Sequence, residues 1–418
     1  MERKTRIWIG LGTALLVGST AAANAAITRE TPVLDHSAKH SALPDRPRIH
    51  IAQAEAAGEG GPNEGGGPVL GTITEFRLSS TDTSAFAYEA KAQVAGYVDL
   101  VAKNYTAAQD AATALREALD ALRSAPTAEA LEAARKTWRT AASAYAETEA
   151  FLNYAGPVDG PGGPFPRLNG WPVDPAMIDS LLADSSQSLA FRAIARLNKV
   201  EAPAKITTGL HVLEYLLWGA DGAVTAEAFA GEAGARRGEY AAALAQLFLN
   251  DMTVVAAAWA PGSNNYRASV EAMDQRNALG RAFAGMAALL GYEVPLRRIG
   301  AGLFPANVNF QPSPFSQTSA EDFSHSFAGA KAVYFATGLD ALVKSTDAEL
   351  AARILTGFEA AEAALGSMNA PYERFLAPPS GSPERATADA AVKALTNLAR
   401  DLRQAGNRLG ILVVVPGM

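Results

Sequence analysis

Long alanine-rich stretches with helical spacing run through most of this chain of 418 residues, from about Ser84 onward. Their apolar residues return every three or four positions, and the alternation typical of strands is nearly absent apart from Ile411 to Val415. Helices with one apolar face bury it by packing on one another. Since 49% of the residues are hydrophobic, a sizeable core can form. The sequence therefore predicts an all-α fold.

The helical stretches fall into two groups of comparable size. We expect helices at about 85–124, 128–152, 204–218, 236–260, 270–290, 320–335, 347–368 and 385–409. The segment PGSNNY, at 261–266, breaks the helical pattern between the two groups. This division predicts two consecutive four-helix-bundle-like domains packed together, an N-terminal bundle at 83–260 and a C-terminal bundle at 261–418.

The first residues have the pattern of a secretory signal. A basic start precedes an apolar run from Ile7 to Val17, and the small residues Ala23 to Ala25 suit cleavage, so we expect a signal peptide at 1–25. The alternative, a membrane-spanning helix, needs about 20 apolar residues, more than this run offers. Export to the periplasm or cell envelope follows. The chain has no cysteine, so neither a lipid anchor through cysteine nor a disulfide framework is expected.

Residues 26–82 are biased toward Ala, Gly, Pro and charge, which predicts a flexible linker. Three of the five histidines, His36, His40 and His50, lie in it. They have no regular spacing, so solvated linker histidines are favoured over a metal site. Such a linker could present the bundles to a partner protein in the cell envelope.

The net charge of the chain is −7, and its basic residues are scattered among acidic ones. Proteins that bind nucleic acid concentrate positive charge on one surface. We therefore expect no nucleic-acid partner.

The predicted helix at 128–152 has one apolar stripe. Taking about 100° per residue, Glu149 lies within this stripe and Glu147 on the opposite face. A carboxylate that points into a core is costly unless it is paired, hydrogen-bonded or bound to a cation. Glu149 is thus a candidate metal ligand, and a structural salt bridge or a bond to a helix end is an equal alternative.

Residues 151–175 contain too many glycines and prolines for a helix, yet carry Tyr154, Phe165 and Trp171 as anchors. Ordered loops of this length are commonly functional. The alternative is a plain connection between two helices.

The segment GLHVLEYLLWGAD, from Gly209 to Asp221, holds the pattern with the clearest chemistry. His211 and Glu214 are three residues apart, so on a helix they share one face. An imidazole with a carboxylate suits a first-row transition metal. A third inward carboxylate is needed, with Glu149 as first candidate and Asp251 as second. The alternative is a core histidine hydrogen-bonded to its neighbouring glutamate.

This segment resembles the Gly-x-His-x-x-Glu signature of the imelysin-like family. Four further stretches resemble the family in the same order, and together the matches cover about 85–410. They are WRTAASAYAETEAF from Trp138, YAGPVDG from Tyr154, LNGWPVDPAMID from Leu168 and SPFSQTSAED from Ser313. Gln311 and Gln317 depart from the acidic or histidine-bearing surroundings of that last stretch in iron-regulated members. Thr318 or Ser319 with Glu321 or Asp322 still predicts a helix cap.

The resemblance implies an exported protein of two helical bundles that binds iron or another metal, or a metal-bearing ligand, in iron acquisition. It implies a metal ion, iron or alternatively zinc, held by His211, Glu214 and Glu149. The residues that would shape or orient the site are Trp171, Asp174, Tyr215, Trp218 and Asp221.

Two other functions remain open. One branch of the family was described as metallopeptidases, but this chain has no His-Glu-x-x-His motif, and Tyr215 rules out His-x-x-Glu-His. Outside the linker the histidines are His211 and His325, so a two-histidine zinc site would have to join them. The other reading is a binding site for a peptide or small molecule without metal.

Overall fold

The computed structural model describes residues 75–79, 86, 88–152, 154–198, 205–303, 310–368 and 371–415. All of them belong to one compact unit, 49–418. The predicted signal peptide, most of the predicted linker, and His36, His40 and His50 lie outside the described residues.

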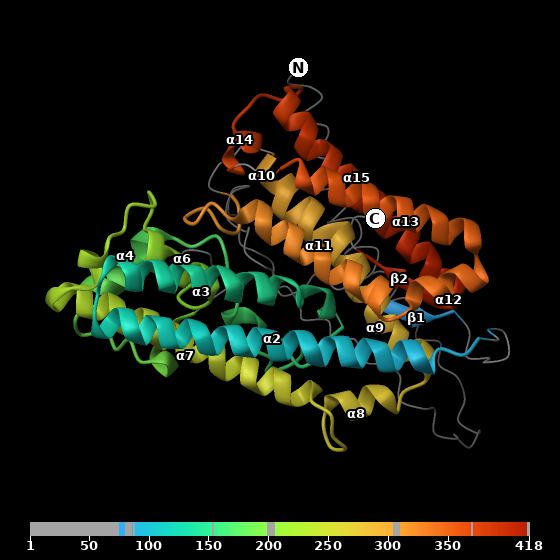
Figure 1. Ribbon diagram of the computed structural model, residues 1–418, viewed down its shortest axis with the longest axis horizontal. Helices are drawn as coiled ribbons and strands as arrows, with labels where there is room; N and C mark the ends of the chain where they lie inside the picture. Colours follow the sequence, from blue (N-terminus) through green and yellow to red (C-terminus); the bar gives the residue numbers. More distant parts are fainter. Residues whose placement is uncertain are drawn as a thin grey trace, which may run out of the picture. The chain divides into compact units, whose positions relative to one another are not determined.

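Helices make up most of the described chain, and the predicted all-α fold is confirmed (Figure 1). The longer helices are α2 (Lys91–Ser124), α3 (Ala128–Ala146), α7 (Gly231–Trp259), α9 (Gln275–Ala288), η6 (Leu289–Gly300), α11 (Ser319–Ala336), α13 (Ala348–Gly366) and α15 (Pro383–Arg408). The shorter ones are η2 (Glu149–Phe151), η3 (Phe165–Arg167), α4 (Pro175–Ala183), α5 (Phe191–Leu197), α6 (Leu210–Trp218), η5 (Ala226–Phe229), α8 (Tyr266–Glu271), α10 (Ala301–Leu303), α12 (Leu339–Thr346) and α14 (Glu373–Leu376). The strands are β1 (Glu75–Leu78) and β2 (Ile411–Val414).

The helix predicted at 128–152 ends earlier than expected. Thr127 caps its start, since its hydroxyl accepts a hydrogen bond from the backbone of Ala130 at 3.2 Å. After Ala146 the chain tightens, because the Thr148 hydroxyl donates to the carbonyl of Tyr145 at 2.7 Å and closes a narrower turn. The short helix η2 follows and carries Glu149 into the core, where the side chain is 4% exposed.

The predicted linker extends too far toward the C-terminus. Within 26–82, residues Glu75–Leu78 form β1, which pairs antiparallel with β2 so that Glu75 faces Val414 and Leu78 faces Ile411. The strand at the C-terminal end of the chain supplies hydrogen-bond partners that local composition does not reveal. This end of the linker is therefore part of the folded unit.

A π-helix, η6, continues the chain beyond the predicted end of the helix at 290. It contains Pro295, a residue that ordinarily interrupts an α-helix because its nitrogen cannot donate. The wider turn of a π-helix runs through this proline and carries the chain on to Arg298. Arg298 is thereby placed in the core, where it pairs with Glu149.

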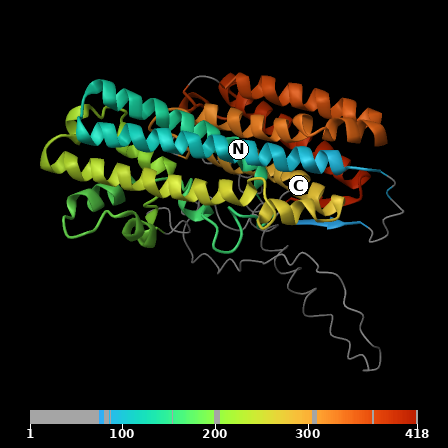
Figure 2. The same ribbon diagram turned by 60° about the horizontal axis from the view of Figure 1, so that its bottom comes forward.

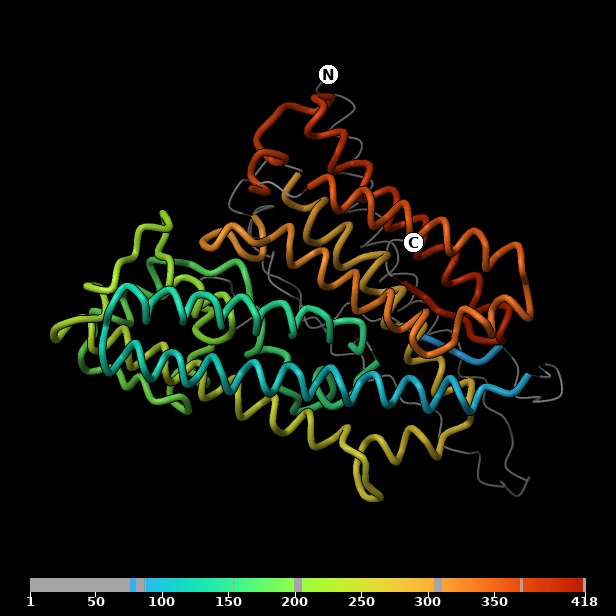
Figure 3. Tube along the Cα trace, viewed as in Figure 1, coloured from blue at the N-terminus to red at the C-terminus, as the bar shows by residue number. Residues whose placement is uncertain are grey.

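The helices pack in two neighbouring groups. In both views of the ribbon α2, α3 and α7 run alongside one another, and α6 packs against α3 and α7 (Figures 1 and 2). The second group consists of α9, η6, α11, α13 and α15, with α15 packed on η6, α13 and α9 (Figure 3). Helices α3 and α11 join the groups, and one hydrophobic cluster includes residues from both. The division into two domains stays a prediction.

Helix α7 is long and apolar enough to cross a membrane by length and composition alone. Half of its most apolar stretch of 18 residues is buried within the protein. The helix packs along α2 and contributes to the core, as an internal helix of a globular protein does.

Glycines hold both ends of α6. Gly209 precedes the helix with a φ of 103° and Gly219 follows it with a φ of 73°, and both values disfavour residues with a side chain. A Cβ on Gly209 would lie 2.8 Å from the carbonyl oxygen of Leu168. The same carbonyl accepts a hydrogen bond of 2.9 Å from the backbone of Leu210. Glycine is therefore required where the chain enters α6.

We predict that Gly209→Ala lowers the free energy of unfolding by about 2 kcal/mol or more, through the unfavourable φ and the clash with Leu168. Urea denaturation followed by circular dichroism measures the change. Gly366→Ala is the control, since a Cβ there meets nothing within 4 Å. Equal stability of the wild type and Gly209→Ala would contradict the prediction.

Candidate functional site

Helix α6 is buried along its whole length and held by side chains from neighbouring helices. The indole nitrogen of Trp138 donates to the carbonyl of Leu210 at 2.7 Å. Arg135 donates to the carbonyl of Leu217 at 3.0 and 3.1 Å, and Arg237 to that of Leu216 at 2.8 Å. These bonds satisfy carbonyls at both ends of the helix and fix its position. Every residue of α6 is buried, on the apolar side of the helix and on the side that carries His211 and Glu214.

His211 and Glu214 share a face of α6, as predicted. His211 is 3% exposed and Glu214 fully buried, and His211 Nδ1 lies 3.3 Å from Glu214 Oε2. The other oxygen, Oε1, accepts two hydrogen bonds of 2.7 Å from Ser316, one from its backbone nitrogen and one from its hydroxyl. A buried carboxylate with several donors keeps its charge at a lower cost. Glu214 thus ties α6 to the segment before α11.

Ser313 links His211 to a third acidic residue. Its hydroxyl donates to Asp322 Oδ2 at 2.6 Å and lies 3.4 Å from His211 Nδ1. The Ser313 backbone nitrogen donates to the hydroxyl of Ser319 at 3.0 Å, and that hydroxyl donates to Gln311 Oε1 at 2.8 Å. One connected polar network therefore surrounds the His/Glu pair.

Asp322 has an altered proton affinity. Burial raises the pKa of its carboxyl to about 7, and the neighbouring His211 and the bond from Ser313 oppose this rise while Glu214 adds to it. The predicted role of Asp322 in capping α11 is not observed, since Thr318 occupies the cap position without a side-chain cap bond. The Thr318 hydroxyl instead bonds to that of Ser316 at 2.9 Å. The Asp322 side chain instead accepts the hydrogen bond of the Ser313 hydroxyl within the network.

Glu149 does not join His211 and Glu214. Both of its carboxylate oxygens accept hydrogen bonds from the guanidinium of Arg298, each at 2.8 Å. Ser326 donates to it at 2.7 Å, and Asn169 lies 3.5 Å away. The inward position predicted from helical spacing is correct, and the salt bridge weighed as an alternative is the partner found. Sequence could not show this, because Arg298 is remote in the chain.

Asp251, the second candidate for a third ligand, is also paired. Arg167 donates to its two oxygens at 2.8 and 2.7 Å. His325 pairs with Glu147, whereas His211 pairs with Glu214. His325 Nδ1 lies 3.1 Å from Glu147 Oε1, and this hydrogen bond raises the pKa of His325. Among the residues that the structure describes, no three His, Asp or Glu side chains form a group able to hold a metal ion.

Three buried polar atoms of the residues in and around this network have no partner among the described residues: His211 Nε2, Arg298 Nε and Glu373 Oε2. Buried polar atoms are nearly always satisfied, so an unpaired one marks a place for water or a ligand atom. The chain's own residues therefore offer two adjacent ligand types, an imidazole and a carboxylate, without a third.

The residues expected to shape the site take separate roles. Trp171 is buried and packs edge-on against Phe310 with ring centroids 5.2 Å apart. Asp174 caps α4, accepting from the backbone of Ala176 at 2.9 Å. The Tyr215 hydroxyl donates to Asp179 at 2.8 Å.

Trp218 and Asp221 line a cavity of about 780 Å³ next to the network. Ser316, which holds Glu214, lines it as well, so α6 lies directly behind its wall. Gln311, Gln317 and Glu373 add polar groups, while Phe315 and several prolines supply apolar surface. Glu373 accepts a hydrogen bond of 2.8 Å from Gln311, which continues the network to the cavity. The arrangement suits a polar organic ligand larger than a single ion.

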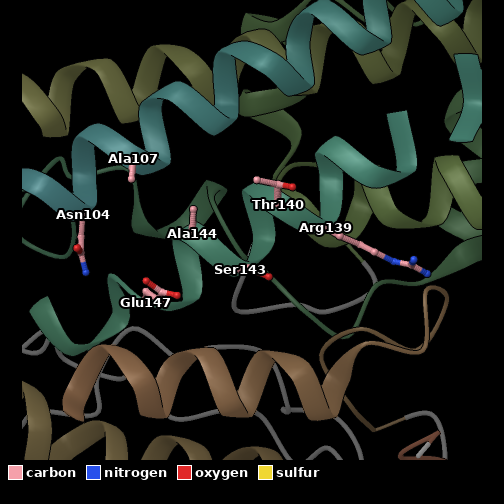
Figure 4. A pocket seen from close by; sticks show the side chains of 7 residues that line it. All are labelled: Asn104, Ala107, Arg139, Thr140, Ser143, Ala144 and Glu147. Carbon is pink, nitrogen blue, oxygen red and sulfur yellow. The ribbon is translucent and has the colours of Figure 1, made fainter. Parts of the chain in front are cut away.

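A smaller hollow of about 400 Å³ lies between α2 and α3 (Figure 4). Asn104, Ser143 and Glu147 line it, together with Arg139, whose side chain extends away from Glu147. Arg139 also lines the larger cavity. The two hollows therefore share one residue.

Comparison with known proteins adds a family to this geometry. The family model described as peptidase M75, imelysin, matches residues 101–402. The chain belongs to the imelysin family. The matched range contains His211, Glu214 and the 313–322 segment that closes on them.

Two relatives extend the comparison. Iron-regulated protein A of Synechococcus elongatus is 34% identical over 128 residues, which span 30% of this chain and 31% of that protein. The match thus covers about a third of the curated relative's length. The crystal structure of a protein proposed to be an iron-regulated protein A precursor, from Parabacteroides distasonis, has a TM-score of 0.66 and 18% identity. It covers 79% of this chain and 98% of the other, which shows that the two share a fold.

The sequence missed the residues that complete the site from a distance. Ser313, Ser316 and Asp322 lie in a stretch recognised only as a family match, and nothing in their spacing predicts a contact with α6. Arg298 lies beyond 290, where the predicted helix ends.

We predict that Glu149→Gln lowers the free energy of unfolding by about 3 to 5 kcal/mol, because it leaves the buried Arg298 charge uncompensated. Thermal and urea unfolding measure this. Glu147→Gln, on the half-exposed neighbour, is the matched control and should cost less than about 1 kcal/mol. A stable Glu149→Gln variant would contradict the structural role of Glu149.

A second prediction concerns Asp322 and pH. Its pKa is about 7 in the folded protein and close to the usual 3.8 when unfolded, so the folded state binds more protons between these values. The stability of the wild type should therefore fall as pH rises from about 4 to 7, relative to Asp322→Asn, which cannot ionise. Urea denaturation at a series of pH values gives the difference. Parallel stability curves for the two proteins would refute the raised pKa.

Proposed function

We propose that this imelysin family protein is exported to the cell envelope and binds iron for uptake in chelated form, in the cavity beside His211 and Glu214. The observation that carries the proposal is the junction at Ser316. This residue lines the cavity and at the same time donates two hydrogen bonds to the buried carboxylate of Glu214. The signature pair is therefore directly connected to a space large enough for a ligand.

Iron as the cargo is supported by two relatives that carry the name iron-regulated protein A. Export is supported by the secretory pattern of residues 1–25. A protein of this kind would meet its ligand outside the cytoplasm, and a cell-envelope partner would receive it.

A chelate fits the residues better than a bare ion. The carboxylates first considered as a third ligand are held by arginines, Glu149 by Arg298 and Asp251 by Arg167. The pair His211 and Glu214 alone is too small a set for iron, which takes more ligands from nitrogen and oxygen. A chelator brings oxygen ligands of its own and needs from the protein mainly a shaped and partly polar pocket.

The roles of the site residues follow from their contacts. Glu214 holds Ser316 in the cavity wall, and His211 positions Ser313 and offers the unpaired Nε2. Trp218 and Phe315 supply aromatic surface for the organic part of the ligand. Replacement of Glu214 would remove the acceptor of both Ser316 hydrogen bonds and so loosen this part of the cavity wall.

The test is iron retention by purified protein. Full-length protein prepared without chelators is equilibrated with iron(III) citrate and, separately, with an iron(III) hydroxamate chelate, and bound iron is counted after gel filtration. The wild type should retain about one iron per chain with at least one chelate. His211→Ala and Glu214→Gln should retain at least about tenfold less at the same concentration, since each removes a charge-assisted or polar contact.

Glu359→Gln, an exposed position on α13, is the matched control and should retain wild-type iron. Circular dichroism of each variant separates loss of binding from loss of fold. Equal iron retention in all variants would exclude the His211 and Glu214 site. Binding of the iron-free chelators with unchanged affinity would instead favour a small-molecule site without metal, and no retention by the wild type would refute the function.

A further inference from the structure

Arg139 differs from the other arginines around α6, because its donors hold no other part of the fold in place. It is exposed on α3 and makes no hydrogen bond or ion pair with any of the residues described. Arg135, one turn earlier, donates to the carbonyls of Leu217 and Val224, and Arg237 donates to those of Leu216 and Tyr215. Those two hold the helix, whereas the donors of Arg139 remain available.

The guanidinium of Arg139 is held in place without using its donors. Its central carbon lies 5.6 Å from the centre of the Trp218 ring, and the same ring contacts Trp138 edge-on. Contact with an aromatic face restrains a guanidinium and leaves N–H groups on its edge free to bind two oxygens side by side. Such a fork matches the two oxygens of a carboxylate, as it does two oxygens of a phosphate.

Arg139 is also the only basic residue among those described that line the cavity of about 780 Å³. Acidic groups lie elsewhere on the lining, and their oxygens are partly used. Asp221 accepts from the backbone of Ala223 at 3.1 Å, and Glu373 accepts from Gln311 at 2.8 Å. A ligand that lacked an anionic group would leave Arg139 without a charged partner in the cavity.

We infer that Arg139 selects ligands that carry a carboxylate, so that the iron is bound as the complex of a hydroxycarboxylate. The carboxylate binds the Arg139 fork, and Arg139 lines both the larger cavity and the smaller hollow along α3 (Figure 4). The iron-bearing part of this inference rests on the proposed function. The recognition of a carboxylate by Arg139 does not, and it can be tested without metal.

The experiment measures the affinity of full-length protein for three probes by isothermal titration calorimetry. The probes are citrate alone, iron(III) citrate, and an iron(III) trihydroxamate complex without a carboxylate. The variants are Arg139→Gln, Arg139→Lys and, as matched control on the same helix, Lys136→Gln, since Lys136 is exposed and lines neither hollow.

Arg139→Gln should weaken both citrate probes by about tenfold to a hundredfold, the usual effect of losing a charge-assisted bidentate contact. Arg139→Lys should restore part of the affinity, because it keeps the charge and loses the fork. Lys136→Gln should match the wild type. Equal affinity of the wild type and Arg139→Gln for iron(III) citrate, or tighter binding of the hydroxamate complex than of iron(III) citrate, would overturn the inference.

Failure of the two proposals can be told apart. If neither iron complex binds the wild type, the proposed function fails, and citrate alone decides the role of Arg139. Citrate binding that is lost in Arg139→Gln then supports carboxylate recognition. Absence of citrate binding by the wild type refutes it.

Discussion

The candidate site depends on how the fully buried carboxylate of Glu214 is satisfied. An ionised group without partners in a core costs several kilocalories per mole, so the chain either neutralises it or surrounds it with donors. Here the donors come from Ser316, more than a hundred residues later in the chain. The contact fixes the segment 313–319 against α6 and, with it, one wall of the cavity. Helix α6 and the approach to α11 are thereby positioned by one polar interaction.

A second buried carboxylate in the same region has a different partner, and this contrast defines the chemistry. Glu149 is bound by Arg298 in a bidentate ion pair, which satisfies both of its oxygens. Glu214 has only a serine and a nearby histidine, and the histidine retains an unpaired nitrogen. In the first pair both carboxylate oxygens are satisfied within the protein, although Arg298 Nε has no partner among the described residues, and the pair serves the structure. The second is open toward further interactions, so a ligand is expected there.

Several features could be predicted because they depend on neighbours along the chain. The inward position of Glu149 and the outward one of Glu147 agree with the prediction from helical spacing, although α3 ends at Ala146 and Glu149 lies in η2. The shared face of His211 and Glu214 followed from their separation of three residues. The bounds of α2, α7, α13 and α15 were close to those expected. The early end of α3 was missed because the hydroxyl of Thr148 closes the turn, a local competition that apolar spacing does not register.

By itself the sequence determined the all-α fold, the candidate pair on α6 and the need for a partner at Glu149, since each depends on periodicity and on the cost of burying charge. Only the tertiary structure decided which partner each buried group receives. Arg298 reached Glu149 across 149 positions, and Ser316 reached Glu214 across 102. Such pairings depend on how helices pack, and many residues of the right kind could have supplied them. The same reason separates Arg139 from Arg135: both lie on α3, and only the position of the neighbouring carbonyls leaves one of them free to bind a ligand.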